Sequence, residues 1–117
     1  MSKYMLVGGY TTESWKAMIE NPTDRTAAAR KVLEAVGGKL ESFYWSFGDD
    51  DFVAIFDAPD DLSAGAGAIA VGSSGALRNV RTIKLITADE SRKLLEKAKV
   101  ATAGYVPPTA RPVGATR

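Results

Sequence analysis

A chain of 117 residues, 45% of them hydrophobic and 25% charged, is long enough to bury the core of one globular domain. The absence of cysteine and histidine excludes disulfides, thiolate nucleophiles, serine hydrolase triads, and the zinc and haem sites that depend on these side chains. The formal net charge is +1. The sequence contains no run of about twenty apolar residues, so no transmembrane helix is predicted.

The charges are unevenly distributed along the chain. Residues 1–75 contain six basic and eleven acidic side chains, whereas residues 76–117 contain nine basic and three acidic ones. This asymmetry is compatible with complementary contacts between subunits or with an anionic ligand. A solvated final helix followed by a basic tail explains it more simply, and we favour that explanation.

The first predicted element is a strand over residues 3–11. Its larger side chains alternate between two faces, with Tyr4, Leu6 and Tyr10 on one and Met5 and Val7 on the other. The paired glycines Gly8 and Gly9 predict a bulge, or a place where another group packs close to the backbone.

Two helical segments follow. Thr12 is expected to cap a short helix that ends at Glu20, before the helix-breaking pair Asn21-Pro22. The same pair is expected to begin the next helix, with Asn21 as its N-cap and Pro22 at its first position. The apolar residues of this second helix have helical spacing and are Ala29, Val32, Leu33 and Val36. Gly37-Gly38 predicts a left-handed end to it.

Residues 39–57 predict a β-hairpin, because two runs rich in aromatic and β-branched residues flank the polar turn Gly48-Asp49-Asp50-Asp51. Strict alternation in the first arm places Leu40, Ser42, Tyr44 and Ser46 on one face and Glu41, Phe43, Trp45 and Phe47 on the other. In the second arm the same rule sets Phe52, Ala54 and Phe56 against Val53 and Ile55.

Asp60 is expected to cap a helix that runs to about Ser74 and is closed by Gly75. Its predicted apolar stripe consists of Leu62, Ala66, Ile69 and Ala70. The many small residues of this helix would let it lie close to a sheet or to another helix.

The last part of the chain predicts a strand, a helix and a tail. The strand covers residues 79–86 and alternates Val80, Thr82, Lys84 and Ile86 with Arg81, Ile83 and Leu85. A capping box from Thr87 to Glu90 begins a helix to about Val100, in which Leu94, Leu95 and Ala98 are expected to be buried. Residues 104–117 contain three prolines and no periodicity, so we expect an extended arm after a domain of residues 1–103.

The predicted order of elements is β-α-β-β-α-β with an additional C-terminal helix. This is the ferredoxin-like plan of an α+β sandwich with an antiparallel sheet. Helices can cover only one face of that sheet, yet both faces of the two predicted central strands are apolar. The second face is therefore expected to be buried against another copy of the chain, in a homodimer or a higher homo-oligomer.

Five segments of the chain carry a family resemblance: KYMLVGGYT, WKAM with the following ENP and DR, GGKLESFYWSFG with its following aspartate, APDD, and NVRTIKLITADE. Together they resemble the GYD domain family, small bacterial and archaeal proteins of largely unknown function in the dimeric α/β-barrel superfamily. The resemblance extends from Lys3 to Leu95 and implies a ferredoxin-like fold and a face-to-face dimer, with no catalytic role to transfer. Gly48 and Asp51 match the family signature, whereas Asp50 stands where the family has a tyrosine.

Five residues are candidates for binding a small ligand between the sheet and its partner subunit, namely Tyr10, Tyr44, Trp45, Arg81 and Lys84. The aromatic residues would line the pocket, and whichever of Arg81 and Lys84 entered it would anchor a carboxylate or a phosphate. The alternative, which we favour, is that the aromatic residues fill the core and the dimer interface, while the two cations protect an edge strand.

The three consecutive aspartates of the hairpin turn are a poor metal site, because they lack the alternate spacing of calcium loops. We expect Gly48 and Asp51 to have structural roles, with Asp51 accepting backbone N–H groups within the turn. No metal, cofactor, nucleic-acid or membrane partner is expected.

Two classes of function remain open. The first is a non-catalytic binding or assembly module, and the second is a cofactor-independent enzyme similar to the monooxygenases and isomerases of the dimeric α/β-barrel superfamily. An enzyme needs two or more ionisable groups within reach of one substrate atom, so the lack of histidine and cysteine favours the binding module. The first residues enter a strand without a basic-then-apolar leader, and a cytoplasmic location is therefore expected.

Overall fold

The computed structural model describes residues 1–109, which fall into two units, Met1–Leu85 and the residues from Ile86 onward. The elements of the first unit are β1 (Ser2–Tyr10), α1 (Thr12–Glu20), α2 (Thr26–Ala35), β2 (Lys39–Trp45), β3 (Phe52–Ala58), α3 (Asp61–Gly72) and β4 (Leu77–Leu85). The second unit contains α4 (Ala88–Gly104). The strands form an antiparallel sheet in the order β2-β3-β1-β4, which confirms the ferredoxin-like α+β fold with an added C-terminal helix.

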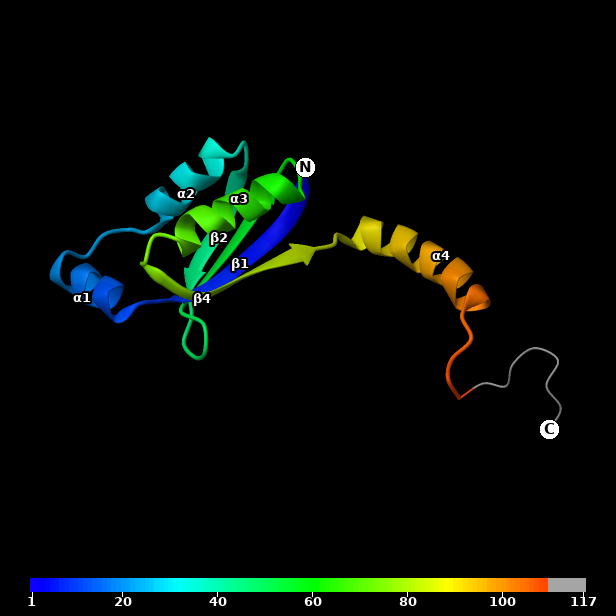
Figure 1. Cartoon of the computed structure of the whole chain (residues 1–117). Coiled ribbons are helices and arrows are strands. Elements are labelled where there is room, and N and C mark those ends of the chain that lie inside the picture. Colours follow the sequence, from blue (N-terminus) through cyan, green and yellow to red (C-terminus); the bar gives the residue numbers. More distant parts are fainter. Residues whose placement is uncertain (110–117) are drawn as a thin grey trace. The chain divides into compact units, whose positions relative to one another are not determined.

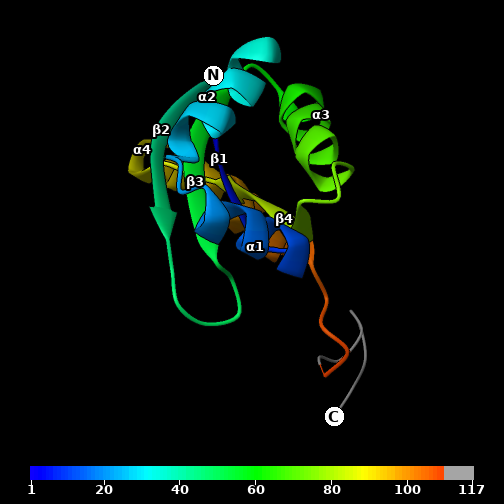
Figure 2. The same cartoon turned by 90° about the vertical axis from the view of Figure 1, so that its left-hand side faces the viewer.

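The two faces of the sheet differ in what covers them. Within the first unit, α2 lies over β2 and α3 lies over β4, both on the same side of the sheet (Figure 1 and Figure 2). We call this side the helix face and the opposite side the open face. In β3, Phe52, Ala54 and Phe56 are buried, whereas Val53 and Ile55 on the open face are only partly buried. The predicted division of the central strands is therefore confirmed.

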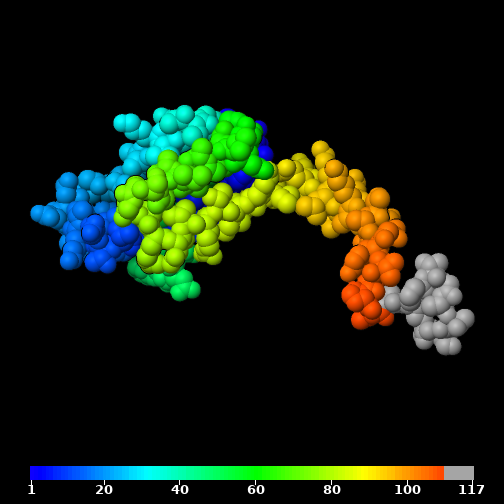
Figure 3. Space-filling view, viewed as in Figure 1, coloured from blue at the N-terminus to red at the C-terminus, as the bar shows by residue number. Residues whose placement is uncertain are grey.

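The core of the first unit lies between the helix face and the two helices. In the space-filling view α3 lies between α2 and β4 (Figure 3). Tyr4 and Phe56 occupy adjacent central strands and stack with their ring centroids 5.5 Å apart. The complete buried cluster is Tyr4, Leu33, Leu40, Ala54, Phe56, Ala58 and Ala64.

Gly8 and Gly9 lie at the bulge that their pairing predicts. The register of β1 against β4 shifts between Val7 and Gly9. A Cβ atom on Gly9 would lie 2.5 Å from Cζ of Arg78, whose guanidinium packs against the backbone there. Any side chain at residue 9 would therefore displace Arg78.

A bulge in β2 makes the predicted alternation of the first hairpin arm wrong at one position. The register of β2 against β3 shifts between Leu40 and Ser42. Because a bulge adds one residue, side chains before and after it exchange faces. Leu40 consequently joins Phe43 in packing at the helix-face core, although strict alternation places them on opposite faces.

The beginnings of α1 and α2 also differ from the predicted ones. Thr11, rather than Thr12, caps α1, and Asn21 ends that helix as its C-cap. Asn21 is therefore not free to begin the next helix. That helix starts at Thr26, whose backbone N–H donates to Oδ1 of Asp24 at 2.9 Å.

The second unit begins with the predicted capping box. Thr87 Oγ1 accepts from the Glu90 N–H, and the Glu90 carboxylate accepts from the Thr87 N–H. The helix continues past its predicted end near Val100 to Gly104. Residues 105–109 are exposed and have no regular secondary structure, and the rest of the predicted arm, 110–117, lies outside the described residues.

Within its own unit, α4 does not bury the residues that the sequence predicted to be buried. No residue of α4 is buried, and Leu94 and Leu95 are 48% and 65% exposed. The described residues of this unit form one helix, so α4 has no second element within the unit to pack against. No helix in residues 1–109 is both long and apolar enough to span a membrane.

Candidate functional site

A cavity of about 330 Å³ lies between the helix face of the sheet and the helices α2 and α3. Its wall is mostly apolar and includes Leu6, Phe43, Phe52 and Phe56 from the strands. At a liquid volume of about 30 Å³ per molecule, the space corresponds to roughly eleven waters. This size falls at the lower end of the range for small-molecule sites, about 300–1,000 Å³.

The cavity exists because α3 turns its small residues toward the sheet. Ala64 and Gly67 are the buried residues of this helix, and Ala68 also lines the cavity. The predicted apolar stripe of α3 is therefore wrong, since Leu62 and Ile69 are 85% and 72% exposed. Small side chains let the helix lie close to its neighbours, but they leave unfilled volume between helix and sheet.

Tyr10 supplies a polar group to this otherwise apolar wall. It is 5% exposed, and its hydroxyl oxygen accepts a hydrogen bond from Nε1 of Trp45 at 3.1 Å. Burial raises the pKa of the Tyr10 hydroxyl, although the hydrogen bond from Trp45 and the nearby charge of Arg25 act in the opposite direction. The hydroxyl therefore keeps its proton at neutral pH.

Arg25 is the second polar group of the cavity, and the sequence interpretation missed it. It lies immediately before α2 and is half-buried in the cavity wall. If the helix began at Asn21-Pro22, as the sequence predicted, Arg25 would lie in its first turn. Nothing at that position would distinguish Arg25 from the other charged residues of the helix. The signal that could have found it is Asp24, whose carboxylate is suited to accept the N–H of Thr26 and begin the helix one residue beyond Arg25.

Trp45 borders a second depression, of about 300 Å³, and does not line the first cavity. The other residues that line it are Trp15, Met18, Ile19, Pro22 and Thr23. This lining has no charged residue, and Ile19 is 76% exposed. The first cavity is therefore the stronger candidate site, because its mostly apolar wall includes the charged Arg25 and the hydroxyl of Tyr10.

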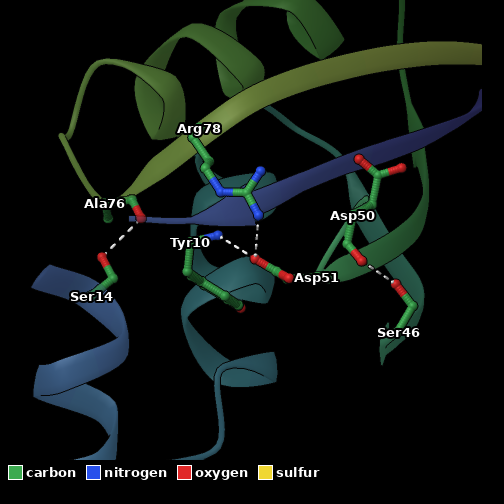
Figure 4. Close-up of polar contacts among 7 residues, drawn as sticks. All are labelled: Tyr10, Ser14, Ser46, Asp50, Asp51, Ala76 and Arg78. Carbon is green, nitrogen blue, oxygen red and sulfur yellow. Dashed lines mark hydrogen bonds and ion pairs between the residues drawn. The ribbon is translucent and has the colours of Figure 1, made fainter. Parts of the chain in front are cut away.

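Asp51 holds the backbone beside the cavity in place (Figure 4). Its Oδ2 atom accepts from the Tyr10 backbone N–H at 2.9 Å and from a guanidinium nitrogen of Arg78 at 3.2 Å. Its own N–H donates to the Gly8 carbonyl at 2.7 Å. The prediction that the Asp51 carboxylate bonds within the turn is wrong, because the hairpin folds back onto β1 and brings the side chain to Tyr10 instead.

The structure brings together only two of the five predicted ligand-binding residues, Tyr10 and Trp45. Tyr44 is 63% exposed and lies opposite Val53 of the open face. Arg81 and Lys84 lie on opposite faces, as predicted: Arg81 is paired across β1 with Val7 and Lys84 with Tyr4. Arg81 forms an ion pair with Asp50, and Lys84 forms one with Asp61.

Tyr4, Asp61 and Lys84 form a polar cluster outside the cavity wall, and their side chains bond to one another. Asp61 Oδ1 accepts from the Tyr4 hydroxyl at 2.6 Å and from Lys84 Nζ at 3.0 Å. The hydrogen bond from Tyr4, followed by that from Lys84, lowers the pKa of Asp61. The hydrogen bond with Asp61 raises the pKa values of both Tyr4 and Lys84. These shifts stabilise the existing charge states, which suits a structural contact between β1, β4 and α3.

The acidic hairpin turn is occupied by contacts within the protein. Asp50 pairs with Arg81 and Asp51 with Arg78. Across residues 1–109 there is no group of three or more Asp, Glu, His or Cys side chains with the geometry to hold a metal ion.

Comparison with known families matches residues 4–95 to the family model described as GYD domain. The matched range runs from β1 into α4 and covers more than half of the chain. Gly48 and Asp51, and the whole wall of the cavity, fall within it. No significant match was found among curated proteins or among solved structures.

Proposed function

The chain belongs to the GYD domain family, and we propose that it is a binding module that holds a small, largely apolar ligand beneath α2 and α3. The observation that carries this proposal is the cavity of about 330 Å³. A concave, mostly apolar space of this size with a few polar groups in its wall is typical of small-molecule sites. The proposed site lies inside one subunit, and not between the sheet and a partner subunit as the sequence suggested.

The chemistry of the cavity wall supports binding over catalysis. Arg25 and Tyr10 are the only ionisable residues among those that line the cavity in the described chain. A guanidinium cannot be deprotonated in proteins, and burial raises the pKa of Tyr10. Neither group can serve as a general base near neutral pH. The alternative of a cofactor-independent enzyme therefore has no base in this cavity.

We expect the cavity to bind an uncharged apolar probe, and a larger side chain at Ala68 to block that binding. N-phenyl-1-naphthylamine is suitable because its fluorescence rises when it leaves water. The Ala68→Phe variant fills the cavity from α3, whereas Ala66→Phe places the same side chain on the exposed side of the same helix. The fluorescence increase should persist in Ala66→Phe and be lost in Ala68→Phe. Equal fluorescence from all three proteins would contradict a site in this cavity.

We also propose that the open face of the sheet forms a homodimer interface. Its central residues are apolar and adjacent across the strands: Met5 pairs with Ile55 and with Ile83, and Val7 pairs with Val53. Val7 is already buried, at 4% exposure, but Met5, Val53 and Ile55 are only partly buried in the single chain, and Ile83 is 37% exposed. A second copy is the simplest cover for such a face, because the same patch serves both partners.

For this assembly we expect light scattering at micromolar concentration to give twice the mass of one chain. Ile55→Glu places a charge at the centre of the open face and should produce monomers. Ile69→Glu introduces the same charge on the exposed side of α3 and should remain dimeric. A natural protein that is monomeric under these conditions would rule out the dimer, and circular dichroism would show that each variant is folded.

A further inference from the structure

The hydroxyl of Tyr10 has a proton to donate and no acceptor for it among the described residues. An indole N–H is only a donor, so in the contact between Trp45 Nε1 and the Tyr10 oxygen the tyrosine must accept. Across residues 1–109, Tyr10 donates no hydrogen bond from its hydroxyl. Tyr10 is buried, with 5% of its surface exposed, and it lines the cavity. Its proton is therefore available to a group inside that cavity.

Arg25 contributes a positive charge to the same wall. It is half-buried, and no carboxylate in the described chain forms an ion pair with it. The nearest acidic residue in sequence, Asp24, accepts the Thr26 N–H at the start of α2. A half-buried guanidinium that keeps its charge is suited to bind an anionic oxygen from a ligand.

These two groups determine which ligand the site would take. Both groups are hydrogen-bond donors, and the cavity wall has no other ionisable residue among those described. The complementary ligand group must therefore accept hydrogen bonds and carry a negative charge. A single guanidinium and one hydroxyl match a carboxylate, which accepts several hydrogen bonds with one charge. The aromatic and aliphatic wall formed by Phe43, Phe52 and Val32 suits an apolar body. Covalently bonded atoms pack more closely than separate water molecules, so a space equal to roughly eleven waters accommodates up to about seventeen non-hydrogen atoms.

We propose that the cavity binds an apolar monocarboxylate of about this size, with its carboxylate between Arg25 and Tyr10 and its hydrocarbon body against the sheet. This inference rests on the proposed function, because it assigns a ligand class to the same cavity. The raised pKa of Tyr10 supports it, since a protonated hydroxyl is required for donation to a carboxylate.

The test compares a carboxylate with its neutral amide by isothermal titration calorimetry. 2-Naphthoate and 2-naphthamide form a rigid pair, and octanoate and octanamide form a flexible pair that suits a cavity too narrow for a bicyclic ring. We expect at least one carboxylate to bind tenfold or more tightly than its amide. Arg25→Met should abolish this preference by weakening the carboxylate alone, and Tyr10→Phe should reduce it several-fold. Arg30→Met, which removes an exposed arginine from α2, the helix that follows Arg25, should leave both affinities unchanged.

The outcomes separate this inference from the proposed function. If the amides and the neutral fluorescent probe bind and Ala68→Phe blocks them, but no carboxylate is preferred, the cavity is a binding site and the carboxylate inference is wrong. An equal loss in Arg25→Met and Arg30→Met would also overturn it, because the effect would then reflect overall charge. If neither probe nor carboxylate binds, both the function and the ligand class fail.

Discussion

Truncation of Phe56 to alanine is expected to lower the free energy of unfolding by about 3–5 kcal/mol. Phe56 is 2% exposed at the centre of β3 and stacks on Tyr4. It also lines the cavity, so its removal would enlarge an existing void that the surrounding strands cannot collapse to fill. Since small domains are stable by only about 5–15 kcal/mol, this loss would remove a large part of the total.

The matched control for this variant is Phe47→Ala. Phe47 has the same side chain but is fully exposed in the hairpin loop, so we expect a change within about 0.5 kcal/mol. Urea denaturation at one fixed protein concentration measures both, and the fixed concentration prevents dimerisation from altering the comparison. Similar losses for Phe47 and Phe56 would contradict the assignment of the helix face as the core.

The features that the sequence predicted correctly depend on signals between neighbouring residues. Alternation in residues 3–11 and 52–56 identifies the two faces of the central strands, since successive side chains of a strand point to opposite sides. Thr87 with Glu90 predicts the helix start because the two residues that make the contact lie three positions apart. Gly8-Gly9 predicts the bulge because paired glycines within a strand are themselves a local signal of one.

The features that were missed depend on partners distant in the sequence. The apolar residues of α3 are spread around the helix, and the approach of α2 and the sheet decides that Ala64 and Gly67 are buried in place of Leu62 and Ile69. The bulge in β2 has no glycine or proline to indicate it. The carboxylate of Asp51 could satisfy the turn locally, and it reaches Tyr10 only because the hairpin loop lies against β1.

The same long-range contact gives a physical role to the family signature in this chain. Gly48, which has φ +128°, lets the loop turn back, and Asp51 then connects the loop to β1 and β4. Asp50, at the position where the sequence resemblance implies a tyrosine, pairs with Arg81, and the Arg81 side chain is 59% exposed. The aspartate of the signature is thus tied to the backbone of a cavity residue, whereas Asp50 lies in a solvent-accessible ion pair.

These two adjacent aspartates should respond very differently to substitution. Asp51→Ala is expected to lower the free energy of unfolding by about 2–3 kcal/mol, because it removes a charged acceptor from the Tyr10 N–H and leaves that buried donor unsatisfied. Asp50→Ala removes an exposed ion pair, and its cost should be about 0–1 kcal/mol. Thermal and urea unfolding of both variants would measure the difference.

Asp51→Ala should also change the fluorescence of Trp45, because the indole N–H of Trp45 bonds to the Tyr10 hydroxyl and Asp51 fixes the Tyr10 backbone. Equal costs for the two variants, with unchanged fluorescence, would mean that Asp51 is an ordinary surface charge and that the cavity residue Tyr10 is held in place without it.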